Sequence, residues 1–185
     1  RPVMKDEMTD EQLIREAVAG NGHAFSQLVD RHYVTVYKMA YKYVGVREDA
    51  EDIAQNASIK LGRSLGGFRF DSAFTTWLYR MVINTAKDYL KKKGRTQMRE
   101  VDLYEDAIGI AGKDNPESQA QQREALQMIS KLPEKLRDAV ILVHWQGLTH
   151  KEAAEVLDIS ENTVSWRLHE VRKYFNDTGK EAHHG

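Results

Sequence analysis

The chain has 185 residues, and 27 Lys and Arg side chains against 28 Asp and Glu leave a formal net charge of −1. Its length allows one ordinary domain or two small ones, and its 41% hydrophobic and 30% charged residues exclude wholesale disorder. Zero cysteines exclude disulfides and thiolate chemistry, and no apolar run approaches the ~18 residues of a membrane span, so we expect a cytoplasmic protein without membrane insertion.

The first part of the chain shows apolar residues at helical spacing. Thr9 and Gln12 have the spacing of a capping box, which predicts the start of a short helix that Gly20 ends. A longer apolar stripe over residues 25–43 predicts a second helix, and Gly45 is suited to end it because glycine readily adopts the left-handed conformation.

Two further stripes follow before the pattern is lost. Residues 50–61 predict a third helix, and residues 74–90 predict a fourth with Asp71 or Ser72 as its N-cap. Together the four helices predict one small all-α domain over residues 8–93.

The second half of the chain predicts a linker and another helical domain. Residues 94–115 lose the periodicity and contain an acidic run, which is typical of a flexible linker. Asn115 followed by Pro116 is a good helix start, and a further helix is expected from Pro133. The second domain is therefore expected over residues 116–176, and the fold class is all-α with two domains.

Within that domain, two short helices predict a helix-turn-helix. Thr149 and Glu152 form a candidate capping box, and Ser160 can cap the next helix after a short turn. In such a motif the second helix enters the DNA major groove and presents its outward face to base edges. The alternative is a helical hairpin used for protein contact. Residues 149–175 carry a net charge of −1, so DNA binding by this domain alone should be weak.

Charge is distributed unevenly along the chain. Residues 1–30 carry a net −3, residues 60–99 carry +8, and residues 100–130 carry −5. The near-neutral total therefore hides one strongly basic block, which suits a polyanionic partner.

Aromatic residues are interleaved with that basic block. Single-stranded nucleic acid binds where bases stack on rings and cations follow the backbone, and residues 68–87 combine both features. Phe74, Trp77 and Tyr89 also fit the apolar stripe, and for these three a core position is the favoured interpretation.

Three segments then resemble the extracytoplasmic-function (ECF) class of bacterial sigma factors. They are residues 49–55, residues 68–87 and residues 132–137, the last leading into the helix-turn-helix. The resemblance extends over about residues 9–175. It implies that residues 8–93 melt the promoter and bind core RNA polymerase through its β and β′ subunits, and that residues 116–176 read the minus-thirty-five element of promoter DNA. It further implies control by an anti-sigma factor, no cofactor or metal, and no catalysis by the chain itself.

The resemblance also assigns site residues. Those implied to contact minus-ten DNA, some through capture of a flipped base, are Lys60, Phe68, Arg69, Phe70, Ser72, Tyr79, Arg80, Asn84 and Lys87. Those implied to contact the minus-thirty-five element are Asn162, Thr163, Ser165, Trp166, Arg167, His169, Arg172 and Lys173. Those implied to dock on the polymerase clamp are Asp49, Glu51, Asp52, Gln55 and Asn56, although an acidic helix start is also typical of an ordinary exposed helix.

Three positions depart from the family pattern. Trp166 is a bulky residue at an outward recognition position, Asn56 stands where glutamate is common, and Asp88 places a negative charge beside the strand-binding residues. The competing interpretation is a helix-turn-helix repressor or activator that binds duplex DNA alone, which leaves the aromatic and basic block unexplained. An enzyme is not supported, because the sequence has no phosphate-binding glycine loop, and His144 and His150 have the wrong helical phase for a metal pair.

Overall fold

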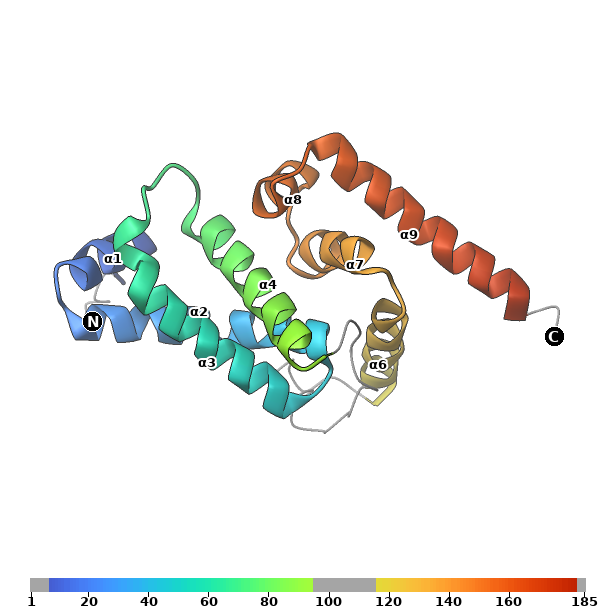
Figure 1. Ribbon diagram of the computed structural model, residues 1–185, viewed down its shortest axis with the longest axis horizontal. Helices are drawn as coiled ribbons and strands as arrows, with labels where there is room; N and C mark the ends of the chain where they lie inside the picture. The colour runs from blue at the N-terminus through green and yellow to red at the C-terminus, as the bar shows by residue number, and fades with distance from the viewer. Residues whose placement is uncertain (1–6, 95–115, 183–185) are drawn as a thin grey trace, which may run out of the picture.

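The structure is a computed structural model that describes residues 7–94 and 116–182, and within these ranges every regular element is a helix (Figure 1). The first domain contains α1 (Asp10–Val18), α2 (Gly22–Val44), α3 (Arg47–Ser64), the short 3₁₀ turn η1 (Leu65–Gly67) and α4 (Phe74–Lys92). The second contains α6 (Pro116–Ser130), α7 (Glu134–Val140), the π-helical turn η2 (Ile141–Trp145), α8 (His150–Leu157) and α9 (Glu161–Ala182). The all-α fold class with two helical domains is confirmed. Apart from Gly94, the expected linker lies outside the described residues.

Local signals place most helix ends where the sequence predicts them. Thr9 accepts a hydrogen bond from the Gln12 amide while the Gln12 side chain accepts one from the Thr9 amide, so the capping box is present. Gly45 ends α2 in the left-handed region, with φ of 70°. Local signals thus fix where α1 begins and where α2 ends before any tertiary contact is considered.

The start of α4 differs from the prediction. Its N-cap is Ala73, which makes no side-chain capping bond, and neither Asp71 nor Ser72 serves as the cap. The physical reason lies in the preceding loop, where Phe70 adopts a left-handed φ of 60° and residues 70–72 form a bend. The two polar residues stay in that bend, outside the first helical turn.

The core of the first domain is built from the inward stripes of its four helices. α2 packs against α1, α3 and α4, and α3 packs against α4. Deeply buried apolar side chains at these contacts include Leu13, Leu28, Met39, Ile53, Leu78 and Val82. Burial of each side chain away from water contributes roughly 1.5–3 kcal/mol. Only apolar residues at helical spacing can all face this core from one side of a helix, which is why the stripes predicted the helices.

The second domain contains the predicted helix-turn-helix, but its last helix is not short. Thr149 and Glu152 form the capping box of α8, and Ser160 caps α9 by accepting a hydrogen bond from the Thr163 amide at 3.1 Å. α9 then runs for 22 residues to Ala182, past the expected domain end at residue 176. Before residue 176 the helix is anchored by Tyr174, whose hydroxyl donates to the Lys131 carbonyl at 3.0 Å.

The two domains lie side by side and share one continuous set of buried apolar residues. α4 packs against α8, and α2 packs against α6 (Figure 1).

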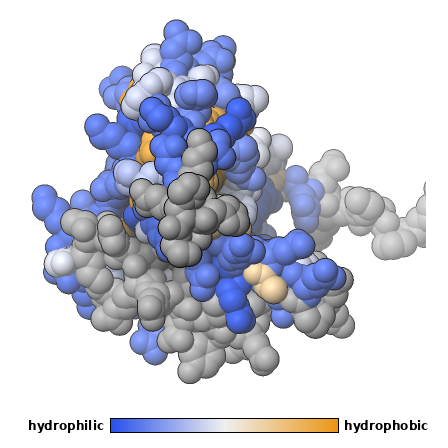
Figure 2. Space-filling view, turned by 90° about the vertical axis from the view of Figure 1, so that its right-hand side faces the viewer, coloured by the Kyte–Doolittle hydropathy of each residue, from blue (hydrophilic) through white to orange (hydrophobic). Residues whose placement is uncertain are grey.

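The face turned toward the viewer in Figure 2 is mainly hydrophilic over the described residues, with small apolar areas between the polar ones. Among the described helices, none has a stretch both long and apolar enough to cross a membrane.

Candidate nucleic-acid interface

The loop between η1 and α4 is held by a cluster of aromatic rings. The ring of Phe68 lies 4.8 Å from Phe70, 5.8 Å from Phe74 and 5.4 Å from Trp77, measured between centroids. Phe74 is buried in the domain core, Phe68 and Trp77 are half-buried, and Phe70 keeps 37% of its surface exposed. The cluster therefore presents one aromatic ring to solvent on a rigid support, with Arg69 and Ser72 exposed beside it.

A basic residue that the sequence does not point to completes this loop. The guanidinium carbon of Arg15 lies 4.3 Å from the centroid of the Phe70 ring, a cation–π contact, while Glu11 holds the same guanidinium at 2.8 Å. Arg15 belongs to α1, 55 residues away in the chain. No local pattern pairs it with Phe70.

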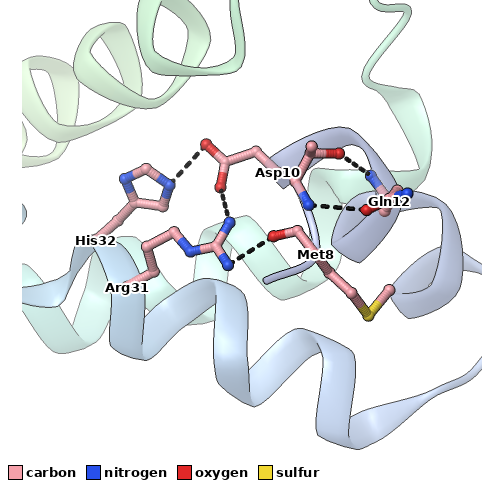
Figure 3. A network of polar contacts seen from close by, with 6 residues as sticks. Met8, Asp10, Gln12, Arg31 and His32 are labelled. Atoms are coloured by element: carbon pink, nitrogen blue, oxygen red, sulfur yellow. Dashed lines mark hydrogen bonds and ion pairs between the residues drawn. The ribbon is translucent and has the colours of Figure 1, made fainter. Parts of the chain in front are cut away.

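A polar network fixes α1, the helix that carries Arg15, against α2, as Figure 3 shows for the network. Asp10 accepts a hydrogen bond from Arg31 at 2.9 Å and lies 2.9 Å from Nε2 of His32. Arg31 also donates to the Met8 carbonyl at 2.7 Å. The His32 ring in turn makes a T-shaped contact with the Phe74 ring, with centroids 5.4 Å apart, which connects the network to the aromatic cluster.

α4 presents the other predicted strand-binding residues along its length. Arg80, Asn84 and Lys87 recur at spacings of four and three, so they share one face, and Tyr79 lies half-buried beside them. Lys60 belongs to α3 and lies against a neighbouring side of α4. Its ammonium is 3.3 Å from the hydroxyl of Thr85 and 3.8 Å from the Asp88 carboxylate. The loop residues lie before the first turn of α4, and the basic residues follow farther along the helix.

Two of these α4 side chains contact the second domain. Arg80 donates to the carbonyls of Val156, at 3.0 Å, and of Glu155. Lys87 donates to the Asp138 carboxylate at 2.6 Å and pairs with Glu134 at 3.3 Å. The face that the sequence predicts for DNA is thus partly an interface between the domains.

Asp138 is the centre of that interface. The carboxylate is 2% exposed and also accepts a 2.6 Å hydrogen bond from the hydroxyl of Tyr43, in the core of the first domain. Burial raises the pKa of Asp138, and the Lys87 charge opposes the rise. Burial also works to lower the pKa of Lys87, but Asp138 and Glu134 outweigh it and raise that pKa, so Lys87 stays protonated at neutral pH.

The outward side of α9 carries the predicted minus-thirty-five residues. Asp158 ends α8 in the left-handed conformation with φ of 55°, which turns the chain so that α9 crosses over α8. Trp166 is 60% exposed, and the Ser165 hydroxyl lies 2.8 Å from Nδ1 of His150 on α8. Of the remaining predicted residues, Asn162, His169, Arg172 and Lys173 are exposed, and Thr163 and Arg167 are half-buried.

The predicted polymerase-docking residues do not all lie on one face. Glu51, Asp52, Gln55 and Asn56 are exposed on α3. Asp49, by contrast, is only 8% exposed and accepts a 2.7 Å hydrogen bond from the Tyr89 hydroxyl, which also lies 3.3 Å from Asp52. Asp49 therefore joins α3 to α4.

Comparison with known proteins identifies the family of the chain. Residues 28–96 match the family described as Sigma-70 region 2, and residues 122–174 match Sigma-70, region 4. The chain is 37% identical over 180 residues to a protein of Haemophilus influenzae named ECF RNA polymerase sigma-E factor, a match that covers 92% of this chain and 95% of the relative.

Two solved structures share the fold. The structure of CnrH in complex with the cytosolic domain of CnrY matches with a TM-score of 0.69 and 25% identity, covering 93% of this chain and 97% of the other. The sigma factor RpoE of Bartonella quintana, solved with the anti-sigma factor NepR, matches with a TM-score of 0.68 and 19% identity, covering 84% and 96%. With the sequence match over nearly its whole length, this chain belongs to the extracytoplasmic-function family of RNA polymerase sigma factors.

Proposed function

We propose that residues 8–93 of this sigma factor bind core RNA polymerase and capture the separated minus-ten strand, and that residues 116–176 read the minus-thirty-five element. The observation that carries the proposal is the exposed Phe70 ring on its aromatic support, in the loop that leads into α4, the helix on which Arg80, Asn84 and Lys87 share one face. An unstacked base needs a ring or pocket that offsets the few kcal/mol lost on flipping, and its backbone needs cations. This arrangement offers both, and the chain contributes binding and strand separation without catalysing a reaction itself.

Polymerase docking is assigned to the exposed side of α3. Glu51, Asp52, Gln55 and Asn56 form a polar, acidic surface that suits a basic partner on the clamp. Asp49 supports this surface from within through its bond to Tyr89. Charge reversal by Glu51→Lys should weaken association with core polymerase. Glu48→Lys makes the same charge change at the start of the same helix and is the control, which should weaken the association less.

Promoter reading is assigned to α9. We expect its outward Asn162, Ser165, Trp166, His169 and Arg172 to meet base edges, and Arg167 and Lys173 to meet phosphates. Because residues 149–175 carry a net −1, specificity should emerge only when the polymerase holds the chain on the promoter.

Control by an anti-sigma factor is part of the proposal. CnrH was solved with the cytosolic domain of CnrY, and the chain covers most of CnrH at 25% identity. An anti-sigma factor of this chain should form a stable complex with it and lower its transcription in a purified system. A partner that binds the chain and leaves its polymerase association and its transcription unchanged would contradict this role.

The test of the strand-capture assignment is the double variant Arg69→Ala, Asn84→Ala. Both side chains are exposed, so the fold should be retained. Permanganate footprinting of a promoter should show loss of strand separation while binding to core polymerase is unchanged. Equal loss of both activities would contradict the assignment. If wild-type holoenzyme gives no promoter-dependent transcript, the whole proposal fails in favour of a duplex-binding regulator.

A further inference from the structure

One side chain of α8 contacts the outward face of α9. Nδ1 of His150 lies 2.8 Å from the hydroxyl oxygen of Ser165, and this hydroxyl donates to the carbonyl of Glu161, one turn earlier on α9, at 3.2 Å. Ser165 is exposed, whereas His150 is half-buried. A hydroxyl assigned above to base edges is therefore held by two partners within the protein.

Local caps fix the backbone on both sides of this contact. Thr149 and Glu152 form the capping box of α8, in which each side chain accepts a hydrogen bond from the other residue's amide, and His150 is the first residue of that helix. Ser160 caps α9 in turn by accepting a hydrogen bond from the Thr163 amide. The imidazole thus reaches across the helix-turn-helix from a position that hydrogen bonds within the motif hold in place.

The two partners of Ser165 decide what its hydroxyl can offer to DNA. A hydroxyl has one proton and two lone pairs, and a backbone carbonyl can only accept. Because the proton of Ser165 goes to the Glu161 carbonyl, the hydroxyl can only accept from His150, which requires a proton on Nδ1 of the imidazole. One lone pair of Ser165 is left for a base.

We infer that His150 is a positioning residue for promoter specificity, which makes Ser165 a hydrogen-bond acceptor in the major groove. Among the base edges there, the donors are N6 of adenine and N4 of cytosine. On the strand that it faces, Ser165 therefore selects adenine or cytosine over guanine or thymine. Without His150 the hydroxyl is free to turn and to donate or accept, so this selection weakens. The inference rests on the reading by α9 proposed above, whereas the bond between His150 and Ser165 does not.

The imidazole proton can be located in the full chain without DNA. Long-range nitrogen–proton correlation spectra distinguish the two neutral tautomers of a histidine, and His150→Asn identifies the signals of His150. In the neutral form, reached where the signals no longer change as pH rises, we expect the proton on Nδ1. Ser165→Ala should shift the tautomers toward Nε2, because it removes the acceptor. A wild-type proton on Nε2 overturns the inference.

Base choice is measured with the holoenzyme, by transcription from a promoter library randomised in the minus-thirty-five element. Ser165→Ala identifies the position that Ser165 reads, because the preference for adenine or cytosine should be lost there. At that position His150→Ala should lower the preference by about two- to tenfold, which is the effect of one hydrogen bond. The double variant should lower it no further than Ser165→Ala does, since both changes act through one hydroxyl.

Two further variants separate positioning from other effects. His150→Asn keeps an N–H donor close to the place of Nδ1 and should restore most of the preference. Lys151→Ala removes an exposed cation from the same turn of α8 and should leave the preference unchanged, because a cation that meets phosphates affects all sequences alike. A loss in His150→Asn as large as that in His150→Ala, with the helical circular dichroism intact, overturns the inference.

The remaining outcomes separate this inference from the proposed function. If His150→Ala keeps the preference that Ser165→Ala loses, His150 does not position the hydroxyl and the inference is overturned. If Trp166→Ala changes the preferred sequence and Ser165→Ala does not, the inference fails while the reading by α9 stands. If neither Trp166→Ala nor Ser165→Ala changes any preference, the reading by α9 fails and the inference falls with it.

Discussion

The hydroxyl of Tyr89 donates a 2.7 Å hydrogen bond to the buried carboxylate of Asp49, which joins the second half of α4 to the first turn of α3. The same hydroxyl lies 3.3 Å from Asp52 on the exposed side of α3. One phenol thus connects the helix assigned to DNA with the helix assigned to polymerase.

Replacement of Tyr89 by phenylalanine should destabilise the fold. The change removes a donor from a carboxylate that is 8% exposed, which costs about 1–2 kcal/mol, and the midpoint of thermal unfolding should fall by about 2–8 °C. Circular dichroism melts measure this. Tyr33→Phe, at a residue that is 40% exposed, is the control and should change stability by less than about 0.5 kcal/mol.

The Tyr89 contribution should also depend on pH. Burial, followed by the bond to Asp49, raises the pKa of Tyr89 above its ordinary value of 10.0. A group whose pKa is raised by folding stabilises the fold fully below its unfolded pKa, and this stabilisation is lost as pH rises toward the folded pKa. Urea unfolding should therefore show a smaller difference between wild type and Tyr89→Phe at pH 11 than at pH 8. A constant difference would contradict a bonded hydroxyl.

Arg15→Ala should impair promoter opening without weakening polymerase binding. Cation–π contacts at exposed sites contribute about 0.5–1 kcal/mol, so loss of the Arg15 contact to Phe70 should slow opening by about two- to fivefold. Stopped-flow fluorescence on a promoter labelled in the minus-ten region measures the rate. Glu11→Gln removes the ion pair of Arg15 but keeps the guanidinium, and should open the promoter at the wild-type rate.

Trp166→Ala should change promoter choice while leaving stability within about 0.5 kcal/mol of wild type, because the side chain is 60% exposed. The indole is placed to make apolar contact in the major groove, such as with a thymine methyl group. Transcription from a library randomised in the minus-thirty-five element should yield a different preferred sequence. Asn176→Ala, farther along α9, should keep the wild-type preference, and an unchanged preference for Trp166→Ala would remove this residue from the reading face.

Lys42 should make stability rise with pH. Burial, with a smaller contribution from Lys38, lowers the pKa of Lys42 to about 8, and its ammonium lies 5.2 Å from the Trp145 ring centroid across the domain interface. A lysine whose pKa is lowered by folding opposes the fold while it is protonated, and the cost disappears as pH rises through about 8 toward the ordinary value of 10.5. The cation–π contact offsets part of this cost.

Lys42→Met should therefore stabilise the chain by about 1 kcal/mol at pH 7, and the gain should shrink by pH 9.5. Urea unfolding at the two pH values measures it. Lys92→Met, on an exposed turn at the end of α4, should show no such trend. If the gain for Lys42→Met did not depend on pH, then removing the cost of burying a charged ammonium would not be its cause.

Local patterns in the sequence predicted the helices and their caps, because these depend on neighbours within four residues. The capping boxes at Thr9 and Thr149 and the left-handed end at Gly45 all formed as expected. The start of α4 did not, since Phe70 takes its conformation from rings that are packed around it. The extension of α9 past residue 176 was missed, because residues 177–181 hold no apolar side chain that would continue the spacing of Val171, Tyr174 and Phe175.

Site residues were predictable only in part, because many of their contacts join segments that are far apart in the sequence. Asp49 shares a helical face with Ile53 and Ala57, so spacing alone could have indicated that it points inward. The contact of Arg15 with Phe70 and that of Asp138 with Tyr43 join segments far apart in the chain. Such pairings depend on how the helices pack, and no local pattern in one sequence contains them.

The two helices assigned to DNA, α4 and α9, differ in how many other contacts they make, and this should shape how the protein diversifies. Arg80 and Lys87 on α4 each hold a neighbouring domain as well as facing the proposed strand, so a substitution there alters two properties together. The outward side chains of α9, such as Trp166, project into solvent from a helix anchored on its opposite side. If the proposed roles hold, substitutions on α9 should change which promoters the chain reads at little cost in stability, while substitutions on the face of α4 should be tolerated less well.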